Sequence, residues 1–397
     1  MKMICKFVPL GLLFLIISYG VYGQSQLLWD FSTQAGIYSS PTIDESTLYI
    51  GSNDSCLYAL NKRNGSLKWK FKTRGEIKSQ PLLHKGSVIF NSTDGLVYSI
   101  DKNNAKKQWI FRTEGEKRLD MWDYYLSSPV YANNKIFVGS GDGHIYAIDP
   151  NNGELIWKYK TKGIIHASPV VHKETVYVGG FDGFFYALNS ENGELVWKFK
   201  TIGATYFPKG EIQRGAAIYK NSVIFGSRDY NVYSLNLETG RGMWNMKEKG
   251  SWVIAPPFIL DDLVYFGTSD SHRFFGLSAK TGHEKHSFHV NMRIYGKAIV
   301  FDNEIYFGCF NGKLYKLNQS KEKLEQVFQT HGSKKNYYNV YNETDKFRSD
   351  FKLYGKNFKE SENTILELGA ILSTPVIENG IAYFGDTNGV FYAYKLK

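Results

Sequence analysis

Short segments in which apolar and polar residues alternate run along most of the chain, and turns rich in Gly, Asn and Asp separate them. Two stretches, 39–73 and 167–201, contain four such segments in the same order. The first segment contains Ser-Pro, the second ends in Gly, the third contains Tyr-Ala-Leu, and the fourth reads Leu-x-Trp-Lys-Phe-Lys-Thr. Alternation at period two is typical of β-strands. The pattern therefore predicts a repeating unit of four strands.

The aromatic residue of the third segment marks the copies of this unit. It recurs mostly every 40 to 48 residues, with one gap of 77, at Tyr58, Tyr98, Tyr146, Tyr186, Tyr233, Phe275, Tyr315 and Tyr392. The turn before it carries Asp54, Asp94, Asp142, Asp182, Asp229, Asp270, Asn311 and Asn388. Asp and Asn close tight turns with their own side chains, so we interpret these residues as turn formers and not as a ring of ligands. The chain thus contains eight copies.

The fourth segment carries a Trp in five copies, at Trp69, Trp109, Trp157, Trp197 and Trp244, and we expect these rings to pack between neighbouring repeats. His286 and Gln326 occupy the same position in copies six and seven. Copy eight ends after three segments, whereas residues 28–33 match the fourth segment at 68–73. The sequence therefore predicts an all-β, eight-bladed β-propeller of four-stranded antiparallel blades, closed by the N-terminal strand completing the last blade.

The repeat at 168–201, with Ser-Pro-Val-Val at its start and Trp-Lys-Phe-Lys-Thr at its end, resembles that of the PQQ-like (pyrroloquinoline quinone) β-propeller family. That family has a WD40-like repeat whose fourth strand is called tryptophan-docking. The resemblance covers about residues 27–397, and the overall form is similar to exported single-domain propellers such as the BamB family of outer-membrane assembly factors. It implies a non-catalytic scaffold that binds an exported or outer-membrane protein partner in the cell envelope.

The N-terminal residues have the order of a secretory signal peptide. Lys2 and Lys6 precede an apolar run at 7–17, and small residues follow up to Gly23. We predict a signal peptide at 1–23 and a single propeller domain at 24–397, with a long loop insertion at 331–367. Cys5 precedes the apolar run, so we expect no lipid anchor, and no other stretch is long enough to span a membrane. The mature protein is then periplasmic or extracellular.

Charge and cysteines narrow the possible partners. The net charge of +10 is spread along the chain without basic blocks, which argues against nucleic-acid binding. Cys56 and Cys309 fall in repeats far apart around the ring, so we expect two free thiols. We also expect the closed ring to be a monomer.

Three long loops, at 114–126, 202–213 and 331–369, connect a fourth segment to the next first segment, and we expect all three on one face. Aromatic and basic side chains are frequent at protein interfaces. The interface candidates are Arg118, Trp122, Tyr124, Tyr125, Lys209, Tyr337, Tyr338 and Arg348. The alternative is that these loops pack on one another.

The residues just before each first strand form a second ring, near the mouth of the central channel. Several are large or charged where the repeat otherwise has small residues. They suggest a pocket for an anionic ligand, with the candidates Lys78, His166, Arg214, Trp252, Arg293 and Tyr295.

Catalytic and metal-binding motifs are not evident, so the sequence favours a protein that is not an enzyme. The cluster His283, His286 and His289 cannot converge on one side of a strand, so we predict no metal site. One alternative is a PQQ-dependent dehydrogenase, which would bind PQQ and calcium. Resemblance to these enzymes also implies two adjacent cysteines, which this chain lacks. We therefore expect no cofactor. A carbohydrate-binding propeller, using Trp122 and the tyrosines, is the other.

Overall fold

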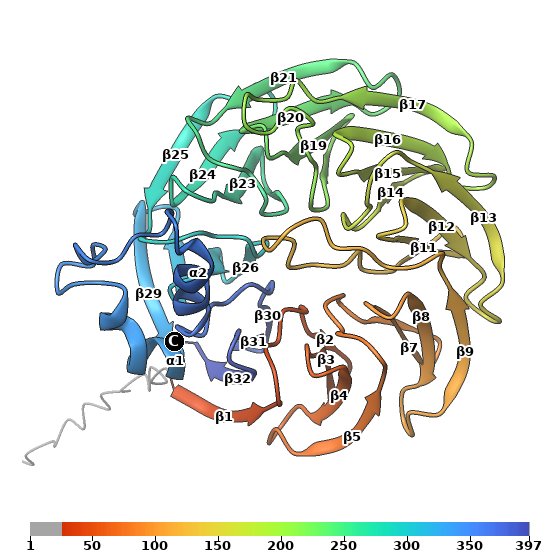
Figure 1. The fold of residues 1–397 in the computed structure, drawn as a ribbon. Helices are drawn as coiled ribbons and strands as arrows, with labels where there is room; N and C mark the ends of the chain where they lie inside the picture. Colours follow the sequence, from red (N-terminus) through yellow and green to blue (C-terminus); the bar gives the residue numbers. More distant parts are fainter. Residues whose placement is uncertain (1–25, 397) are drawn as a thin grey trace, which may run out of the picture.

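The computed structural model describes residues 26–396. Eight four-stranded antiparallel sheets stand around a central axis as the blades of a β-propeller, in sequence order around the ring (Figure 1). The predicted fold is therefore confirmed. The predicted signal peptide at 1–23 lies outside the described residues, and no helix within 26–396 is long and apolar enough to cross a membrane.

Each blade runs from an inner strand beside the axis to an outer strand. The first four blades contain β2 (Thr42–Ile43), β3 (Thr47–Gly51), β4 (Cys56–Asn61) and β5 (Leu67–Lys72); β6 (Leu82–His84), β7 (Ser87–Ser92), β8 (Leu96–Asp101) and β9 (Lys107–Arg112); β10 (Val130–Ala132), β11 (Lys135–Gly139), β12 (His144–Ile148) and β13 (Leu155–Lys160); and β14 (Val170–His172), β15 (Thr175–Gly179), β16 (Phe184–Asn189) and β17 (Leu195–Lys200).

The next three blades contain β18 (Ala217–Tyr219), β19 (Ser222–Gly226), β20 (Asn231–Asn236) and β21 (Gly242–Lys247); β22 (Phe258–Leu260), β23 (Leu263–Gly267), β24 (Arg273–Ser278) and β25 (Glu284–His289); and β26 (Ile299–Phe301), β27 (Glu304–Gly308), β28 (Lys313–Asn318) and β29 (Lys323–Gln329). Blade eight contains β30 (Val376–Glu378), β31 (Ile381–Gly385), β32 (Val390–Lys395) and β1 (Gln26–Ser32). Middle strands are mostly buried, and along the outer strands exposed residues mostly alternate with half-buried ones.

The N-terminal strand closes the ring. Strand β1 pairs antiparallel with β32, so that Asp30 lies opposite Tyr392 (Figure 1). Without β1, the edge of β32 would expose unpaired backbone groups. The chain ends thus complete blade eight together, as the sequence predicted.

The Asp of the turn before each third strand has the predicted structural role. Asp54, for example, accepts hydrogen bonds from the hydroxyl of Tyr58 at 2.6 Å and from the backbone N–H of Cys56 at 2.9 Å. It also accepts the N–H of Gln34 at 3.0 Å, which comes from the preceding blade. The same side chain therefore closes its own turn and ties two blades together.

Three blades depart from this pattern. In blade seven the turn residue is Asn311, whose amide donates to the hydroxyl of Tyr315 at 2.8 Å. In blade eight, the hydroxyl of Tyr392 donates to Asp386 at 2.8 Å, and not to Asn388, the turn residue that the repeat predicts. The amide of Asn388 instead reaches the carbonyl of Glu367. In blade six, Phe275 has no hydroxyl, so Asp270 has no partner on the third strand of its own blade.

The indole rings pack between blades as expected. Each of the five Trp side chains donates from Nε1 to a backbone carbonyl of the next blade, at 2.9 to 3.1 Å, on Lys102, Pro150, Ser190, Leu237 and Ala279. In blade six, Nδ1 of His286 lies 3.0 Å from the carboxylate of Glu322 in the corresponding turn of blade seven. This polar contact replaces the buried area that an indole would supply.

The insertion after blade seven has its own short helices. These are α1 (His331–Asn336), the 3₁₀ helix η1 (Tyr337–Asn339) and α2 (Phe358–Leu366). Thr330 caps α1 by accepting the N–H of Ser333. Cys56 and Cys309 are both buried and unpaired.

Candidate functional site

The three long loops lie together on one face of the ring, which we call the loop face. The loop at 114–126 extends inward over the channel (Figure 1). The hydroxyl of its Tyr125 donates to the carbonyl of Leu372, in blade eight, at 3.0 Å. The amide of Gln213, in the second loop, donates to the carbonyl of Trp122 at 2.9 Å. The loop at 114–126 therefore joins blades that are distant in sequence.

Helix α2 places one carboxylate, Glu362, at the centre of the loop face. This side chain is buried and accepts two hydrogen bonds from Nη1 of Arg293, at 2.8 and 2.9 Å. It also accepts the hydroxyl of Tyr124 and, at 3.3 Å, the indole N–H of Trp122. A buried carboxylate is stable only when it is paired and hydrogen-bonded, and Glu362 meets both conditions. It thus fixes the insertion to the loop at 114–126.

A second ion pair, with a buried arginine and a partly exposed carboxylate, lies beside the first. Arg228 is 2% exposed, and its Nη1 lies 2.5 Å from the carboxylate of Asp120. Its Nε and Nη2 both donate to the amide oxygen of Gln213, at 3.1 and 2.9 Å. The guanidinium also stacks over Trp252, 4.5 Å from the ring centroid. This geometry is typical of Arg in a fixed structural position.

His166 is held between two carboxylates. Its Nδ1 lies 2.9 Å from Asp123, and its Nε2 lies 2.7 Å from Glu116. Burial alone would lower the pKa of His166, but hydrogen bonds to Asp123 and Glu116 outweigh burial and raise the pKa to about 9. The imidazole is therefore protonated at neutral pH and pairs with both acids, which leaves neither ring nitrogen available to a ligand.

An aromatic pocket opens on the loop face, with a volume of about 140 Å³. Its aromatic walls are Trp122, Phe207, Tyr230, Trp252, Tyr295 and Tyr354. Its polar groups are arranged in a chain, since Arg293 donates to the hydroxyl of Tyr354 at 3.0 Å and that hydroxyl donates to Asp270. Asp270 is the turn carboxylate of blade six, and Tyr354 of the insertion supplies the hydroxyl that Phe275 lacks.

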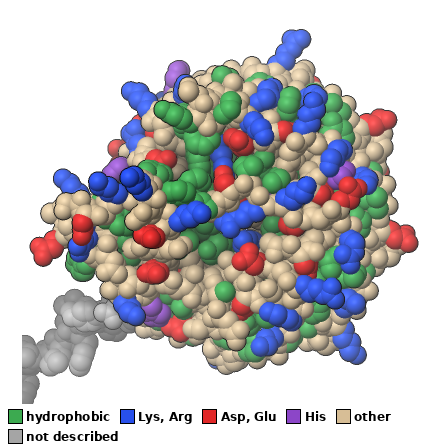
Figure 2. All heavy atoms as spheres, in the orientation of Figure 1, with side chains coloured by type: hydrophobic (Ala, Val, Ile, Leu, Met, Phe, Trp, Pro, Cys, Tyr) green, Lys and Arg blue, Asp and Glu red, His purple; other side chains and the backbone are tan. Residues whose placement is uncertain are grey.

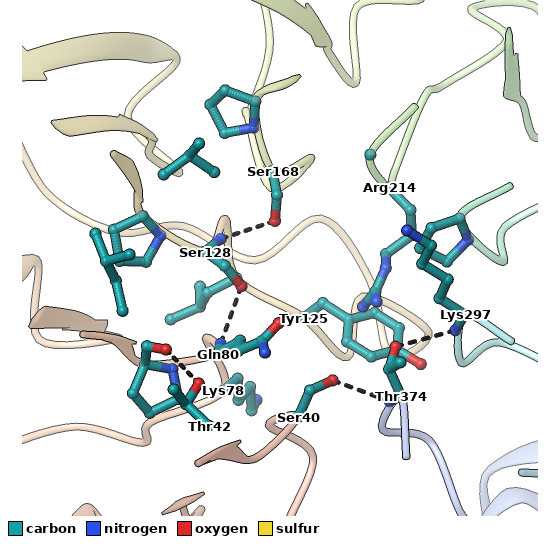
Figure 3. A pocket seen from close by; sticks show the side chains of 18 of the residues that line it. Ser40, Thr42, Lys78, Gln80, Tyr125, Ser128, Ser168, Arg214, Lys297 and Thr374 are labelled. Atoms are coloured by element: carbon teal, nitrogen blue, oxygen red, sulfur yellow. Dashed lines mark hydrogen bonds between the residues drawn. The ribbon is translucent and has the colours of Figure 1, made fainter. Parts of the chain in front are cut away.

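A larger cavity of about 610 Å³ occupies the channel itself (Figure 3). Towards the loop face it ends at Tyr38, Tyr125 and Leu126, and away from it the walls follow the inner strands. Arg214 stacks over Tyr125, with its guanidinium carbon 3.5 Å from the ring centroid. Nζ of Lys78 lies 2.5 Å from Glu76. Tyr125 thus separates this cavity from the loop face.

The structure distributes the six ligand-pocket candidates over three places. Lys78 and Arg214 line the channel cavity. A second group lines the aromatic pocket: Trp252, Arg293 and Tyr295. His166 lines neither, because its ring is enclosed by Asp123 and Glu116. The six candidates therefore do not form one pocket. That either cavity binds a ligand stays a prediction.

The interface candidates divide into buried and exposed residues. Tyr124, Tyr125 and Tyr337 are 2%, 3% and 6% exposed, so they stabilise the loops from within, as the alternative of loop packing proposed. Trp122 is half-buried. The exposed candidates are Arg118, Lys209, Tyr338 and Arg348. Figure 2 shows Lys and Arg side chains gathered near the centre of the ring, with hydrophobic side chains between them.

Several residues of these sites were not among the candidates. Ile202 and Tyr206, at 70% and 81% exposed, are the most prominent apolar side chains of the loop face. Glu362 and Arg228 are the buried members of the two ion pairs, and Lys297 lines the channel cavity. A signal existed for Lys297, since it occupies a position where four other repeats have Ser or Thr and none of the others has a charged residue. Glu362 lies in an insertion without a counterpart in other repeats, so the repeat gave no signal for it.

Comparison with known proteins places these features in a family. No curated protein matches the sequence. The structure is similar to that of BamB from Moraxella catarrhalis, with a TM-score of 0.70, 16% identity, and coverage of 94% of this chain and 100% of that one. It is also similar to the computationally designed Ika8 protein, with a TM-score of 0.69, 15% identity and the same coverage. These two likenesses show the fold.

A family model described as "Outer membrane protein assembly factor BamB" matches residues 22–123, 121–250 and 211–339. These segments together span most of the chain, including seven of the eight repeats. The chain therefore belongs to the BamB family of PQQ-repeat β-propellers.

Proposed function

We propose that this protein is a non-catalytic, exported scaffold that binds a protein partner of the cell envelope through its loop face, in the assembly of outer-membrane proteins. Membership of the BamB family supports this role. The proposal also includes export by the predicted signal peptide at 1–23, without a lipid anchor.

The observation that carries the proposal is the rigid fixation of the loop face. Arg293, Arg228 and His166 are buried, and each pairs with a carboxylate at 2.9 Å or less. Loops held in this way do not have to be ordered when a partner binds, which lowers the entropic cost of association. Ile202 and Tyr206 project from this fixed surface, and exposed Tyr side chains are frequent in the centres of protein interfaces.

The same ion pairs argue against catalysis. A general acid or base must reach the proton that it transfers. His166, Asp123 and Glu362 are at most 3% exposed, and each is already bonded to other groups of the loop face. We infer that these groups stabilise the loops and do not act on a substrate.

The residues present do not fit PQQ with calcium. Calcium prefers carboxylate and carbonyl oxygens as ligands. Among the described residues that line the channel cavity, none is acidic. In the aromatic pocket, Asp270 already accepts the hydroxyl of Tyr354 and lies 3.7 Å from Nε of Arg293. We propose that neither group is a resident cofactor, and a melting temperature unchanged by PQQ and calcium is the expected result.

Site-specific photocrosslinking in the cells that produce the protein tests the scaffold. A photoreactive phenylalanine analogue replaces Tyr206 in one variant and Val196 in the other. Val196 is 52% exposed on the outer strand β17, so it is a control of similar accessibility away from the loop face. We expect position 206 alone to crosslink to a periplasmic or outer-membrane protein, which mass spectrometry identifies. Equal crosslinking from both positions, or a partner outside the cell envelope, would contradict the proposal.

A further inference from the structure

Four hydroxyl groups stand around the channel at equivalent places in four blades, one residue before the Pro of the first segment. They belong to Ser40, Ser128, Ser168 and Thr374 (Figure 3). Each oxygen accepts a backbone N–H of the preceding blade, at 2.9 to 3.2 Å, from Thr374, Gln80, Ser128 and Lys297 respectively. The four groups therefore share one orientation relative to the ring.

The hydroxyl protons at these positions have no acceptor among the described residues. A hydroxyl has one O–H donor in addition to its lone pairs. Because a backbone N–H already approaches each oxygen, the proton is left to donate elsewhere, and the cavity is the adjacent space. All four residues line that cavity. The channel thus presents a set of hydrogen-bond donors.

Positive charge accompanies these donors. Lys297 takes the place of the hydroxyl in blade seven, and its side chain points into the cavity, as does that of Arg214 (Figure 3). Within the described part of the chain, no carboxylate lies within 4.0 Å of either group. Desolvation lowers the pKa of Lys297 and that of Arg214, so both groups have lost part of their hydration without gaining a counter-ion.

We propose that the channel cavity binds a small anion with several oxyanion groups, from the side of the ring opposite the loop face. Arg214 and Lys297 supply the charge, and the four hydroxyls supply directed hydrogen bonds. A volume of about 610 Å³ exceeds the size of a single inorganic ion and lies in the usual range for organic ligands. Leu82, Val130 and Val170 line the wall and suit a carbon skeleton.

Polycarboxylates and phosphate esters share this chemistry, and calorimetric titration at constant ionic strength distinguishes them. Citrate and glycerol 3-phosphate are the two probes, and glycerol is the neutral control. We expect saturable binding at one site by at least one of the probes and no saturable heat with glycerol. Binding by citrate alone assigns the site to carboxylates, and binding by glycerol 3-phosphate alone assigns it to phosphate esters.

Charge-neutralising variants locate the site. In the Arg214→Gln/Lys297→Gln protein, we expect affinity to fall at least tenfold. The control Lys106→Gln/Lys173→Gln removes the same charge from exposed positions outside the cavity and should bind the probes as the unchanged protein does. If the double variant does not fold, Lys297→Gln alone replaces it, because the side chain of Lys297 still reaches solvent. We then expect a smaller loss of affinity.

Two outcomes overturn the proposal. One is the lack of saturable binding of both probes to the unchanged protein; the other is equal affinity in the channel variants and the control. Replacement of Tyr206 on the loop face should leave anion binding unchanged, so this result is independent of the scaffold proposal.

Discussion

Trp29 of β1 packs directly on Gly65, in the turn between β4 and β5 of the first blade. A Cβ on Gly65 would lie 2.4 Å from Cε3 of Trp29. The same contact joins blades inside the ring, where a Cβ on Gly193 would lie 2.6 Å from Cε3 of Trp157. The place where the two ends of the chain meet is therefore packed like the other contacts between blades.

The first prediction concerns this contact. Gly65→Ala should destabilise the protein by about 2–4 kcal/mol, because the added methyl group displaces Trp29 and the backbone has φ of +72°, which disfavours residues other than Gly. Urea unfolding followed by Trp fluorescence measures the loss. Gly86→Ala is the matched control, since Gly86 has φ of +85° but nothing within 4 Å of the added methyl. Equal losses in the two variants would show that the contact with Trp29 contributes nothing.

A second prediction concerns Ala105, which occupies the corresponding turn of blade two and packs against the same core cluster as Trp69. Its φ of 59° is left-handed, whereas Gly occupies this place in blade one. Ala105→Gly removes this strain but also gives the unfolded chain more freedom. We expect a net stabilisation of up to about 1 kcal/mol in urea unfolding. A loss of stability would show that the left-handed backbone at Ala105 is not strained.

A third prediction concerns the carboxylate that anchors the insertion. Glu362→Gln leaves the guanidinium of Arg293 without its buried counter-charge, and we expect a loss of about 3 kcal/mol. The loop at 331–369 should also become more susceptible to limited proteolysis. Glu360→Gln changes an exposed residue of the same helix and should alter neither property. A stable Glu362→Gln protein with a resistant loop would disprove the anchoring role.

The fourth prediction is a dependence of stability on pH that originates from His166. Its pKa rises from an ordinary value of 6.5 to about 9 in the fold. Below pH 6.5 both states carry the proton, so the contribution of His166 to stability is complete. As the pH rises further, the unfolded chain releases its proton while the folded protein keeps it, so the free energy of unfolding falls until about pH 9.

A shift of this size corresponds to roughly 3 kcal/mol. Unfolding in urea at several pH values between about 6 and 9 measures the slope. His166→Gln should be less stable at the acidic end and should have a nearly flat profile over this range. If the variant keeps the slope of the unchanged protein, another group is responsible.

The repeat made the fold predictable because its structural residues act within one copy or between adjacent copies. Asp54 closes its own turn as predicted, by accepting the backbone N–H of Cys56, and it also accepts the hydroxyl of Tyr58 four positions on. The pairing of β1 with β32 could also be predicted, since residues 28–33 match the fourth segment of another copy. Asp386 was missed because the turn of blade eight places its carboxylate two residues before the expected position of Asn388.

The sites were less predictable because their residues are exceptions to the repeat. Arg293 and Trp252 have similar positions in neighbouring repeats, and both line the aromatic pocket. Lys78 and Arg214 come from the same ring of positions but lie on the other side of Tyr125. This division depends on the loop at 114–126, whose path over the channel is set by contacts with Leu372 and Glu362, more than 230 residues away. No local pattern encodes such contacts.

Tyr125 lies at the end of the channel cavity, where it bonds to Leu372 and stacks under Arg214. The proposed anion site and the proposed interface on the loop face therefore lie on opposite sides of this side chain. Occupation of the cavity and contact with a large partner on the other side are therefore sterically compatible. If both proposals hold, one copy of the protein binds the anion and the partner at the same time.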